Sequence, residues 1–301
     1  MQPPLVVNVI LNTNRREDTL ACLESLANST YSNQLTLVLD NASTDGSVKT
    51  IQNRYPGVRV IPLLENKGYA GNNNVGIKVA LEQGAEWVFI LNEDVILAPD
   101  CLECLMQSSS TDPLIGILGP MVYHFTEPTI IQSAGGLLSR DWVSVHRGQN
   151  QEDRGQFSYP DQVDWISGCA ILIHRNVIDQ VGLLDERFFY YWEETEWCLR
   201  ARKSGWKIVH VPVAHVWHKG VQRDYRPSPN VTYYATRNWF FLLDKHHAPW
   251  HARLHAGWRT IRTMASWTIL PKWRGMRAHR DAMWQGLVDY LNHKGGMRAY
   301  K

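Results

Sequence analysis

Along the first 100 residues, apolar positions alternate between short β-branched runs and stretches with helical spacing. Short runs of Val, Ile, Leu and Phe predict strands buried in a sheet, and apolar intervals near 3.6 predict helices packed on that sheet. Strands are expected at 5–11, 35–39, 58–63 and 87–91, and helices at 19–26, from 47 onward and at 74–83. Strands that alternate with helices are typical of βαβ units, so this pattern predicts an α/β protein with a mainly parallel central sheet.

The pattern changes twice in the rest of the chain. Residues 124–160 are rich in Gly, Ser, Gln and Asp with little periodicity, which predicts a variable loop or β-hairpin insert near the site. Residues 250–291 have helical spacing interrupted at Pro271. We therefore expect one α/β domain over 1–245, divided near residue 120, followed by a helical tail over 246–301.

Charge separates this tail from the body. The chain has 31 Lys and Arg against 29 Asp and Glu, and residues 245–301 hold 11 of the former and two of the latter, so the tail is +9 and the rest −7. A basic helical segment with interleaved Trp suits an anionic membrane surface. A helical cap packed on the body, or an oligomer contact, is the alternative. Nucleic acid is not expected as a partner, because the body is acidic and no nucleic-acid-binding motif appears.

Cysteine usage indicates the compartment. Five scattered cysteines and an amino terminus without signal-peptide character favour a cytoplasmic protein with free thiols. Cys101 and Cys104 lack a second pair of ligands nearby, so helix packing is expected there rather than zinc or redox chemistry. No apolar run is long enough to cross a bilayer, so contact with the inner face of the cell membrane would be peripheral.

Acidic and amide side chains follow the predicted strands at the sheet edge where open α/β folds bind ligands. Asp94 directly follows an apolar strand and is expected to hold Mg²⁺ or Mn²⁺ for a diphosphate. Asp40 opens an Asp-Asn-Ala-Ser-Thr-Asp-Gly-Ser run and is expected to accept hydrogen bonds from a base or ribose. The glycines and asparagines of 66–76 predict close approach of backbone to a ligand. Taken alone, each acid is equally well explained as a cap or solvated turn.

Three carboxylates, Glu193, Glu194 and Glu196, open a predicted helix directly after three aromatic residues. Acids at a helix N-terminus are favourable by about 0.3–1 kcal/mol, which is a purely structural explanation. Crowding like charges beside aromatic rings also raises carboxylate pKa values, which suits a proton acceptor. We therefore expect one of these residues to act as a general base.

In this order, the segments resemble the family 2 glycosyltransferases, especially the branch that contains bacterial rhamnosyltransferases. The matching segments are 40–47, 66–68, 74–77, 91–94, 163–168 and 182–189, and the resemblance covers about residues 5–245. It implies a GT-A fold, with a nucleotide-binding half over about 1–120 and an acceptor half over about 121–245. It also implies a nucleotide-diphosphate sugar as donor and a saccharide or lipid-linked saccharide as acceptor.

The resemblance further implies roles for individual residues. Contacts with the nucleotide sugar are expected at Asn12, Asp40, Asn66, Gly68, Asn74, Asn92 and Asp94, metal ligands at Asp94 and His218, and acceptor contacts at Asp164, Trp165, Gly168 and Trp192. Glu194 stands where the family has its catalytic Asp, and Glu193 is the fallback base. Asn92 replaces the first Asp of the usual Asp-x-Asp, which predicts that the metal arrives with the donor.

These expectations describe a metal-dependent, inverting glycosyltransferase in which Glu194 deprotonates the acceptor hydroxyl. By analogy with the family, dTDP-rhamnose is the first expected donor and a UDP-sugar the second. Two other classes stay open. A sugar-nucleotide nucleotidyltransferase would need a basic, glycine-rich first turn, and residues 12–16 contain no glycine. A non-catalytic binder of nucleotide sugars or glycans is permitted by the change from Asp to Glu at position 194.

Overall fold

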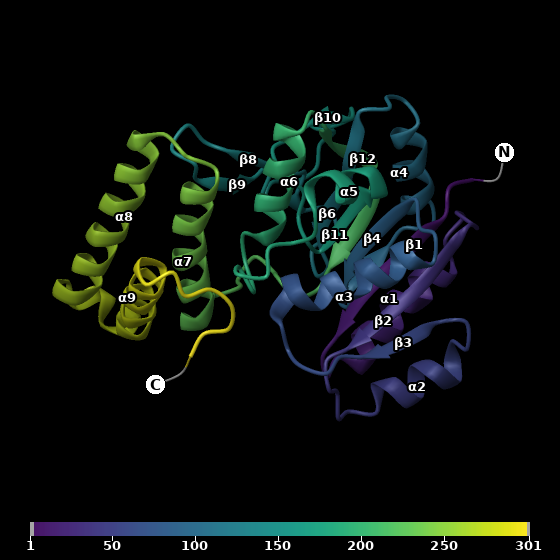
Figure 1. Cartoon of the computed structure of the whole chain (residues 1–301), viewed down its shortest axis with the longest axis horizontal. Helices are drawn as coiled ribbons and strands as arrows, with labels where there is room; N and C mark the ends of the chain where they lie inside the picture. The colour runs from purple at the N-terminus through teal and green to yellow at the C-terminus, as the bar shows by residue number, and fades with distance from the viewer. Residues whose placement is uncertain (1–2, 300–301) are drawn as a thin grey trace.

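A mixed sheet of ten strands forms the centre of the computed structural model, which describes residues 3–299 (Figure 1). The order across the sheet is β10-β12-β6-β11-β4-β1-β2-β3, with β5 paired to β12 and β7 to β6. The strands are β1 (Val6–Asn12), β2 (Gln34–Asp40), β3 (Arg59–Pro62), β4 (Trp87–Asn92), β5 (Val95–Leu97), β6 (Ile115–His124), β7 (Ile131–Ser133), β10 (Asp161–Gln162), β11 (Ala170–His174) and β12 (Lys207–His218).

The first four strands are parallel neighbours, as the sequence pattern predicts. β11 runs antiparallel between β4 and β6, and β12 is parallel to β6. A separate hairpin of β8 (Gly136–Leu138) and β9 (Ser144–His146) confirms the β-hairpin expected within residues 124–160.

Helices cover both faces of this sheet (Figure 1). Because side chains alternate along a strand, Ile10 and Val38 belong to one core, whereas Val9 and Leu39 belong to the other. Residues of α1 and α4 complete the first core, and residues of α3, α5 and α6 complete the second. The helices of the body are α1 (Arg16–Ala27), α2 (Ser47–Arg54), α3 (Gly68–Glu82), α4 (Cys101–Ser109), α5 (Arg175–Val181) and α6 (Glu193–Lys203).

The C-terminal region is helical and contains the expected break at Pro271. It consists of α7 (Pro229–Lys245), α8 (Trp250–Ile269), the 3₁₀ turn η1 (Pro271–Met276) and α9 (Arg277–Leu291). α9 packs closely on α7, where a Cβ on Gly286 would lie 2.7 Å from the carbonyl oxygen of Tyr233. Within residues 3–299, no helix is both long and apolar enough to cross a membrane.

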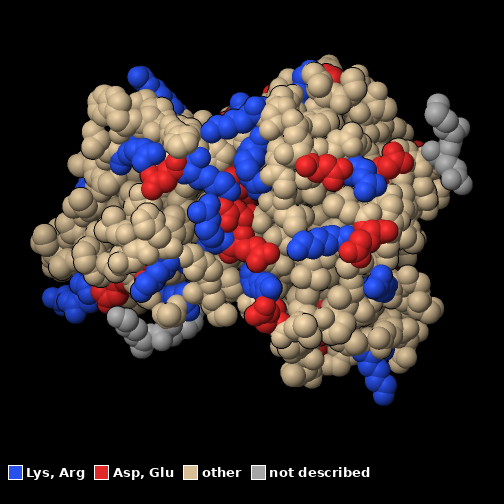
Figure 2. Space-filling view, viewed as in Figure 1, with Lys and Arg blue, Asp and Glu red and all other residues tan. Residues whose placement is uncertain are grey.

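Ion pairs join these helices to the body. The Lys245 ammonium lies 2.7 Å from Asp185 and 3.0 Å from Glu196. Figure 2 shows charged side chains of both signs gathered along the boundary between the C-terminal helices and the sheet domain. The outer surface of the helices in the same view carries wide areas without charge.

Candidate active site

A cavity of about 440 Å³ lies at the sheet edge where β1, β4 and β12 end. Cavities of about 300–1,000 Å³ are typical of small-molecule sites. We call it the donor cavity. Its lining comes from strand ends, the start of α3 and three loops: Leu11, Thr13, Arg15, Asn41, Asn66, Gly68, Tyr69, Asn72, Asn92, Glu93, Asp94, Phe189, Tyr190, Tyr191, His218, Gly220, Val221 and Tyr225.

Asp94 and His218 meet in the wall of this cavity. Asp94 follows β4, His218 is the last residue of β12, and Nε2 of the imidazole lies 3.1 Å from Oδ1 of the carboxylate. Both residues are only 6% exposed. Burial alone would raise the pKa of the Asp94 carboxyl, but the nearby His218 outweighs burial and holds that pKa below its usual range. Asp94 is therefore an anion at neutral pH.

The neighbours of His218 orient its ring. Nδ1 lies 3.0 Å from the carbonyl oxygen Oε1 of Gln132, and so carries the proton that this oxygen accepts. On the other side, Nδ2 of Asn92 lies 3.4 Å from Nε2 and donates toward it. Both neighbours favour the tautomer in which Nε2 presents its lone pair, the form in which histidine binds metals.

In the tautomer with Nε2 unprotonated, His218 no longer donates to Asp94, and two lone pairs face each other between the two side chains. Oδ1 of Asp94 is buried and has no hydrogen-bond partner, although Nε2 of His218 lies 3.1 Å away. A cation between these atoms would satisfy both, so the residues fit a divalent metal. Among residues 3–299 no third His, Cys, Asp or Glu completes a metal cluster. Other ligands would have to come from a bound molecule, in line with the expectation that the metal arrives with the donor.

Glu193 and Glu194 begin α6, and their charges act on Tyr69, which lines the donor cavity. Burial and the adjacent Glu194 raise the pKa of Glu193 far above its usual range, and Oε2 of Glu193 has no partner. Burial raises the pKa of Glu194 to about 7. Glu196 differs, because His246 at 3.2 Å and then Arg200 at 2.9 Å outweigh its burial and lower its pKa. The pKa values of Glu193 and Glu194 are therefore both raised, as expected for a carboxylate that accepts a proton near neutral pH, whereas that of Glu196 is not.

The carboxylates of Asp94 and Glu194 both lie close enough to Cys169 to influence its thiol. The pKa of the Cys169 thiol is raised to about 12, first by burial and further by the charges of Asp94 and Glu194. Cys169 directly follows Gly168, whose carbonyl oxygen accepts a hydrogen bond from the Tyr69 hydroxyl at 2.5 Å. The Asp94–His218 pair and Glu194 thus both lie near the segment around residues 168–169.

Comparison with known proteins agrees with this geometry. Residues 9–182 match the family model described as glycosyl transferase family 2. The chain belongs to this family. This glycosyltransferase is 31% identical over 256 residues to the N-acetylglucosaminyl-diphospho-decaprenol L-rhamnosyltransferase of Mycobacterium tuberculosis, covering 77% of this chain and 82% of the relative. It is 28% identical over 208 residues to the dTDP-rhamnosyl transferase RfbF of Shigella flexneri, covering 64% and 65%.

Solved structures show that the glycosyltransferase has the expected GT-A fold. GalNAc-T7 with UDP, GalNAc and Mn²⁺ superposes with a TM-score of 0.68 at 16% identity, covering 97% of this chain and 58% of that one. The mannosyltransferase PcManGT from Pyrobaculum calidifontis, with GDP-Man and Mn²⁺, has a TM-score of 0.60 at 14% identity, covering 98% and 89%.

A strained segment lies directly before α6 of this glycosyltransferase. Phe189, Tyr191 and Trp192 have φ angles of 61°, 70° and 75°, which cost bulky L-residues about 1–2 kcal/mol each. Buried Asn238 of α7 holds this backbone by donating to the carbonyl oxygens of residues 188, 190 and 191 at 2.7–2.8 Å. Arg237 adds bonds of 3.1 Å to the carbonyls of residues 187 and 188. Helix α7 therefore sets the shape of the site.

The structure corrects the role expected for Asn12. Its side chain is 0% exposed, and Nδ2 donates to Asp40, Ser43 and Ser47 at 2.8–3.0 Å. Direct contact with a nucleotide sugar is therefore wrong for Asn12, which positions Asp40 instead. Asp40 is 5% exposed and also accepts a bond from the backbone of Ser43. Its carboxylate oxygens keep further acceptor capacity, so contact with a base stays a prediction.

Asn74 is likewise structural. The segment expected as a ligand-binding loop is the beginning of α3, which starts at Gly68 rather than Asn74. Asn74 exchanges hydrogen bonds of 2.9 and 3.0 Å with the backbone of Leu184, so it ties α3 to that loop and not to a ligand. Gly68 and Asn66 do line the donor cavity. Gly68 has φ of +70°, and a Cβ there would overlap Phe189, so the glycine permits close approach to protein.

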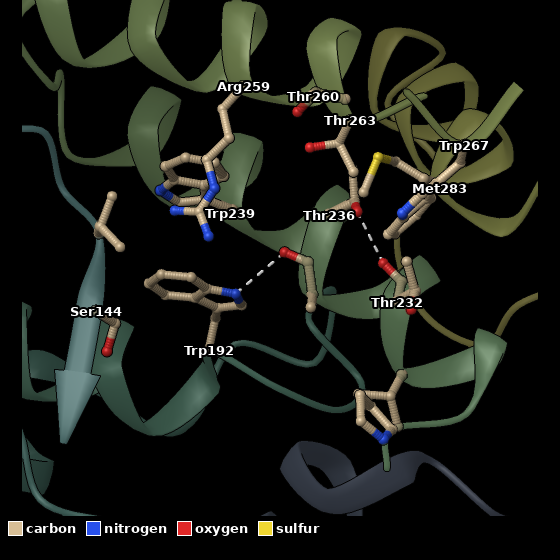
Figure 3. Close-up of a pocket in the computed structure, with 14 residues that line it drawn as sticks. Ser144, Trp192, Thr232, Thr236, Trp239, Arg259, Thr260, Thr263, Trp267 and Met283 are labelled. Atoms are coloured by element: carbon tan, nitrogen blue, oxygen red, sulfur yellow. Dashed lines mark hydrogen bonds between the residues drawn. The ribbon is translucent and has the colours of Figure 1, made fainter. Parts of the chain in front are cut away.

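Only one of the acceptor-side residues faces a second cavity. Asp164 is occupied by Arg202 and by the backbone N–H of Leu138, and Trp165 is 3% exposed with its ring edge against His146. Both side chains are thus held by the protein, and acceptor contact stays a prediction for both. Gly168 holds Tyr69 through its carbonyl, as described above. Trp192 lines a cavity of about 380 Å³ between the body and the C-terminal helices (Figure 3).

Some residues of the site give no recognisable sequence signal. Gln132 lies in the insert expected to vary, yet it orients His218. Gly220 follows His218 by two positions, and a Cβ on it would collide with Oδ2 of Asp94. Glu93 lines the donor cavity, and burial together with Asp94 raises its pKa to about 7. The spacing of His218 and Gly220, a His-x-Gly pattern at the end of the last strand, is the one feature of the sequence that could have indicated Gly220.

Proposed function

We propose that this glycosyltransferase moves a rhamnosyl or related hexosyl group from a dTDP- or UDP-sugar to a hydroxyl of a lipid-linked saccharide, with inversion. The buried Asp94–His218 pair facing the donor cavity carries the proposal, because a cation bound between the two side chains would satisfy both. Two relatives named as rhamnosyltransferases support the donor, and the diphospho-decaprenol in one name supports the acceptor class.

Asp94 and His218 would hold Mg²⁺ or Mn²⁺, with the donor diphosphate completing the shell. When bound, such a cation neutralises charge that develops on a departing nucleoside diphosphate. Gln132 keeps His218 in the binding tautomer, and the lack of a Cβ at Gly220 leaves room beside Asp94. Asn92 is a neutral neighbour of this pair, so affinity for metal without donor is expected to be weak.

Glu194 accepts the proton of the attacking hydroxyl in this proposal. Its pKa of about 7 gives a substantial ionised fraction at neutral pH, and bases near the working pH are the most effective. Glu193 stays the fallback base, and its side chain is only 3% exposed, whereas that of Glu194 is half-buried and therefore more open to an acceptor. The acceptor then attacks the anomeric carbon from the face opposite the diphosphate, and this single displacement inverts the configuration.

Contact with an anionic membrane surface accompanies a lipid-linked acceptor in this proposal. Trp250, Leu254, Trp258 and Ile261 of α8 are 73%, 62%, 58% and 64% exposed, and their spacing of four, four and three residues places them on one face. Exposed basic residues of α8 directly adjoin these apolar residues in sequence: Arg253 precedes Leu254, and Arg262 follows Ile261. Peripheral attachment at the inner face of the cell membrane would bring the site to such an acceptor.

Incubation with radiolabelled dTDP-rhamnose and UDP-sugars, with Mg²⁺, Mn²⁺ or EDTA, tests the proposal. Metal-dependent transfer to a prenyl-diphosphate-linked sugar, or slow donor hydrolysis without acceptor, would support it. Pyrophosphate exchange would instead identify a nucleotidyltransferase. Saturable donor binding with no turnover under any condition would identify a non-catalytic binder.

A further inference from the structure

The cavity beside Trp192 has a composition unlike that of the donor cavity. It lies between the start of α6 and the C-terminal helices, and Figure 3 shows Trp192 and Trp239 on one side of it and Trp267 and Met283 on the other. We call it the helical cavity. The remaining lining residues are Val143, Ser144, Pro227, Val231, Thr232, Ala235, Thr236, Arg259, Thr260 and Thr263.

The walls of the helical cavity favour an apolar chain over a sugar. Of the described residues that line it, none has a carboxylate or amide side chain, the groups that usually orient sugar hydroxyls. The hydroxyl of Thr236 donates to the carbonyl of Thr232 at 2.8 Å, and the hydroxyl of Thr232 contacts Nδ1 of His279 at the same distance. These threonines therefore contribute mainly methyl surface to the wall.

One cationic side chain lies at the opening. Arg259 lines the cavity, is exposed, and stacks its guanidinium over Trp239 at 5.7 Å. Trp239 in turn is parallel to Trp192, with ring centroids 6.4 Å apart. An apolar cavity with a single guanidinium at its mouth complements an amphiphile that has an anionic end.

The helical cavity adjoins the proposed chemistry and the proposed membrane face. Tyr191 lines the donor cavity and Trp192, the next residue, lines the helical cavity, so the strained segment separates the two. Glu193 and Glu194 follow immediately. α8 supplies Arg259 and Thr263 to the cavity, while Trp258 and Ile261 of the same helix project to solvent. A lipid leaving a bilayer at α8 would thus reach the catalytic helix through this cavity.

We propose that the helical cavity binds the first isoprenoid units of a polyprenyl-diphosphate-linked acceptor, with the diphosphate at Arg259. This assignment rests on the proposed function and deepens it, because it names where the lipid part of the acceptor sits. The sugar that follows the diphosphate would then lie beside Trp192, toward Glu194.

Calorimetry with farnesyl diphosphate as the probe tests the assignment without any sugar donor. Thr263→Trp fills the cavity and should weaken binding more than tenfold. Thr268→Trp makes the same change at an exposed position of α8 outside the lining, and should bind like the parent chain. Arg259→Gln should lower affinity for farnesyl diphosphate by about tenfold or more, the value of a charge-assisted bond, and leave farnesol binding unchanged.

The outcomes separate this assignment from the proposed function. Loss of farnesyl diphosphate binding in Thr263→Trp, with donor hydrolysis and thermal melting unchanged, supports the helical cavity. Equal affinity in the two tryptophan variants, or no binding to the parent chain, overturns it even if donor hydrolysis is intact. Should Thr263→Trp fail to fold, the comparison of farnesyl diphosphate with farnesol in Arg259→Gln decides alone.

Discussion

Replacing Glu194 with Gln tests the assignment of the general base most directly. The amide keeps the size and much of the hydrogen bonding of the side chain but cannot accept a proton. A positioned base contributes about 10²–10⁴-fold, so transfer should fall by at least about a hundredfold while donor affinity stays unchanged. In the parent chain, kcat/KM should rise tenfold per pH unit below about pH 7 and then level off, because only the ionised carboxylate of Glu194 accepts a proton.

The same substitution should alter stability with a predictable sign. The pKa of Glu194 rises from 4.5 to about 7 on folding, so the folded state retains a proton that the unfolded state has lost between these values. Stability of the parent chain therefore falls as pH rises from about 4.5 to 7, by at most about 3 kcal/mol. Glu194→Gln removes this loss, so its stability relative to the parent should increase over that window and stay constant above it.

The two measurements are rate assays with labelled donor from pH 5 to 9 and urea unfolding at pH 4.5 and pH 8. Glu24→Gln on the exposed face of α1 makes the same chemical change far from the site and should match the parent in both. Near-normal turnover of Glu194→Gln would refute the assignment. A pH-independent rate in the parent, or identical pH dependence of stability in both chains, would refute the perturbed pKa.

Other predictions address the metal site and the surface of α8. Asp94→Ala should abolish metal-dependent binding of nucleotide sugar in calorimetry, and unchanged affinity would remove Asp94 from the site. Gln132→Ala should weaken Mn²⁺ binding in the presence of nucleotide by about 10–100-fold, because His218 loses the acceptor that fixes its tautomer; equal affinity would mean that Gln132 does not orient the ring. Serine at both Trp258 and Ile261 should reduce sedimentation with anionic vesicles by at least about tenfold without affecting donor hydrolysis, and undiminished sedimentation would contradict membrane contact through α8.

The parallel half of the sheet was predictable because its signal is local. Runs such as Trp87–Leu91 are apolar on both faces, and their ends place Asp40 and Asp94 at one edge by topology alone. The antiparallel insertion of β11 between β4 and β6 has no such signal. It depends on pairing over about 80 positions of sequence, which neither periodicity nor turn residues encode.

Polar residues buried for structural reasons account for the wrong assignments. Asn12 and Asn74 lie in segments typical of ligand binding. Their side-chain amides instead form hydrogen bonds within the protein, that of Asn12 with Asp40 and that of Asn74 with the backbone of Leu184. A sequence shows that an amide needs partners and does not show whether these belong to the protein or to a ligand. The reverse holds for Gln132, because only the pairing of β7 with β6 brings its side chain to His218 at the end of β12.

The C-terminal helices contribute to the site itself, whichever way the tail meets a membrane. Asn238 of α7 holds the left-handed backbone of the segment that ends at Trp192, and α6 begins at the next residue, directly before Glu194. Arg237 links the same segment to the carbonyl of Gly296 beyond α9 at 2.8 Å. The choice between membrane contact and a packed cap is therefore not exclusive: α9 packs on α7 through its inner face, while α8 keeps its large apolar residues exposed. Residues of α8 also line the helical cavity. A shift of this helix on binding a bilayer would therefore change the surroundings of Trp192, which directly precedes the proposed catalytic acids.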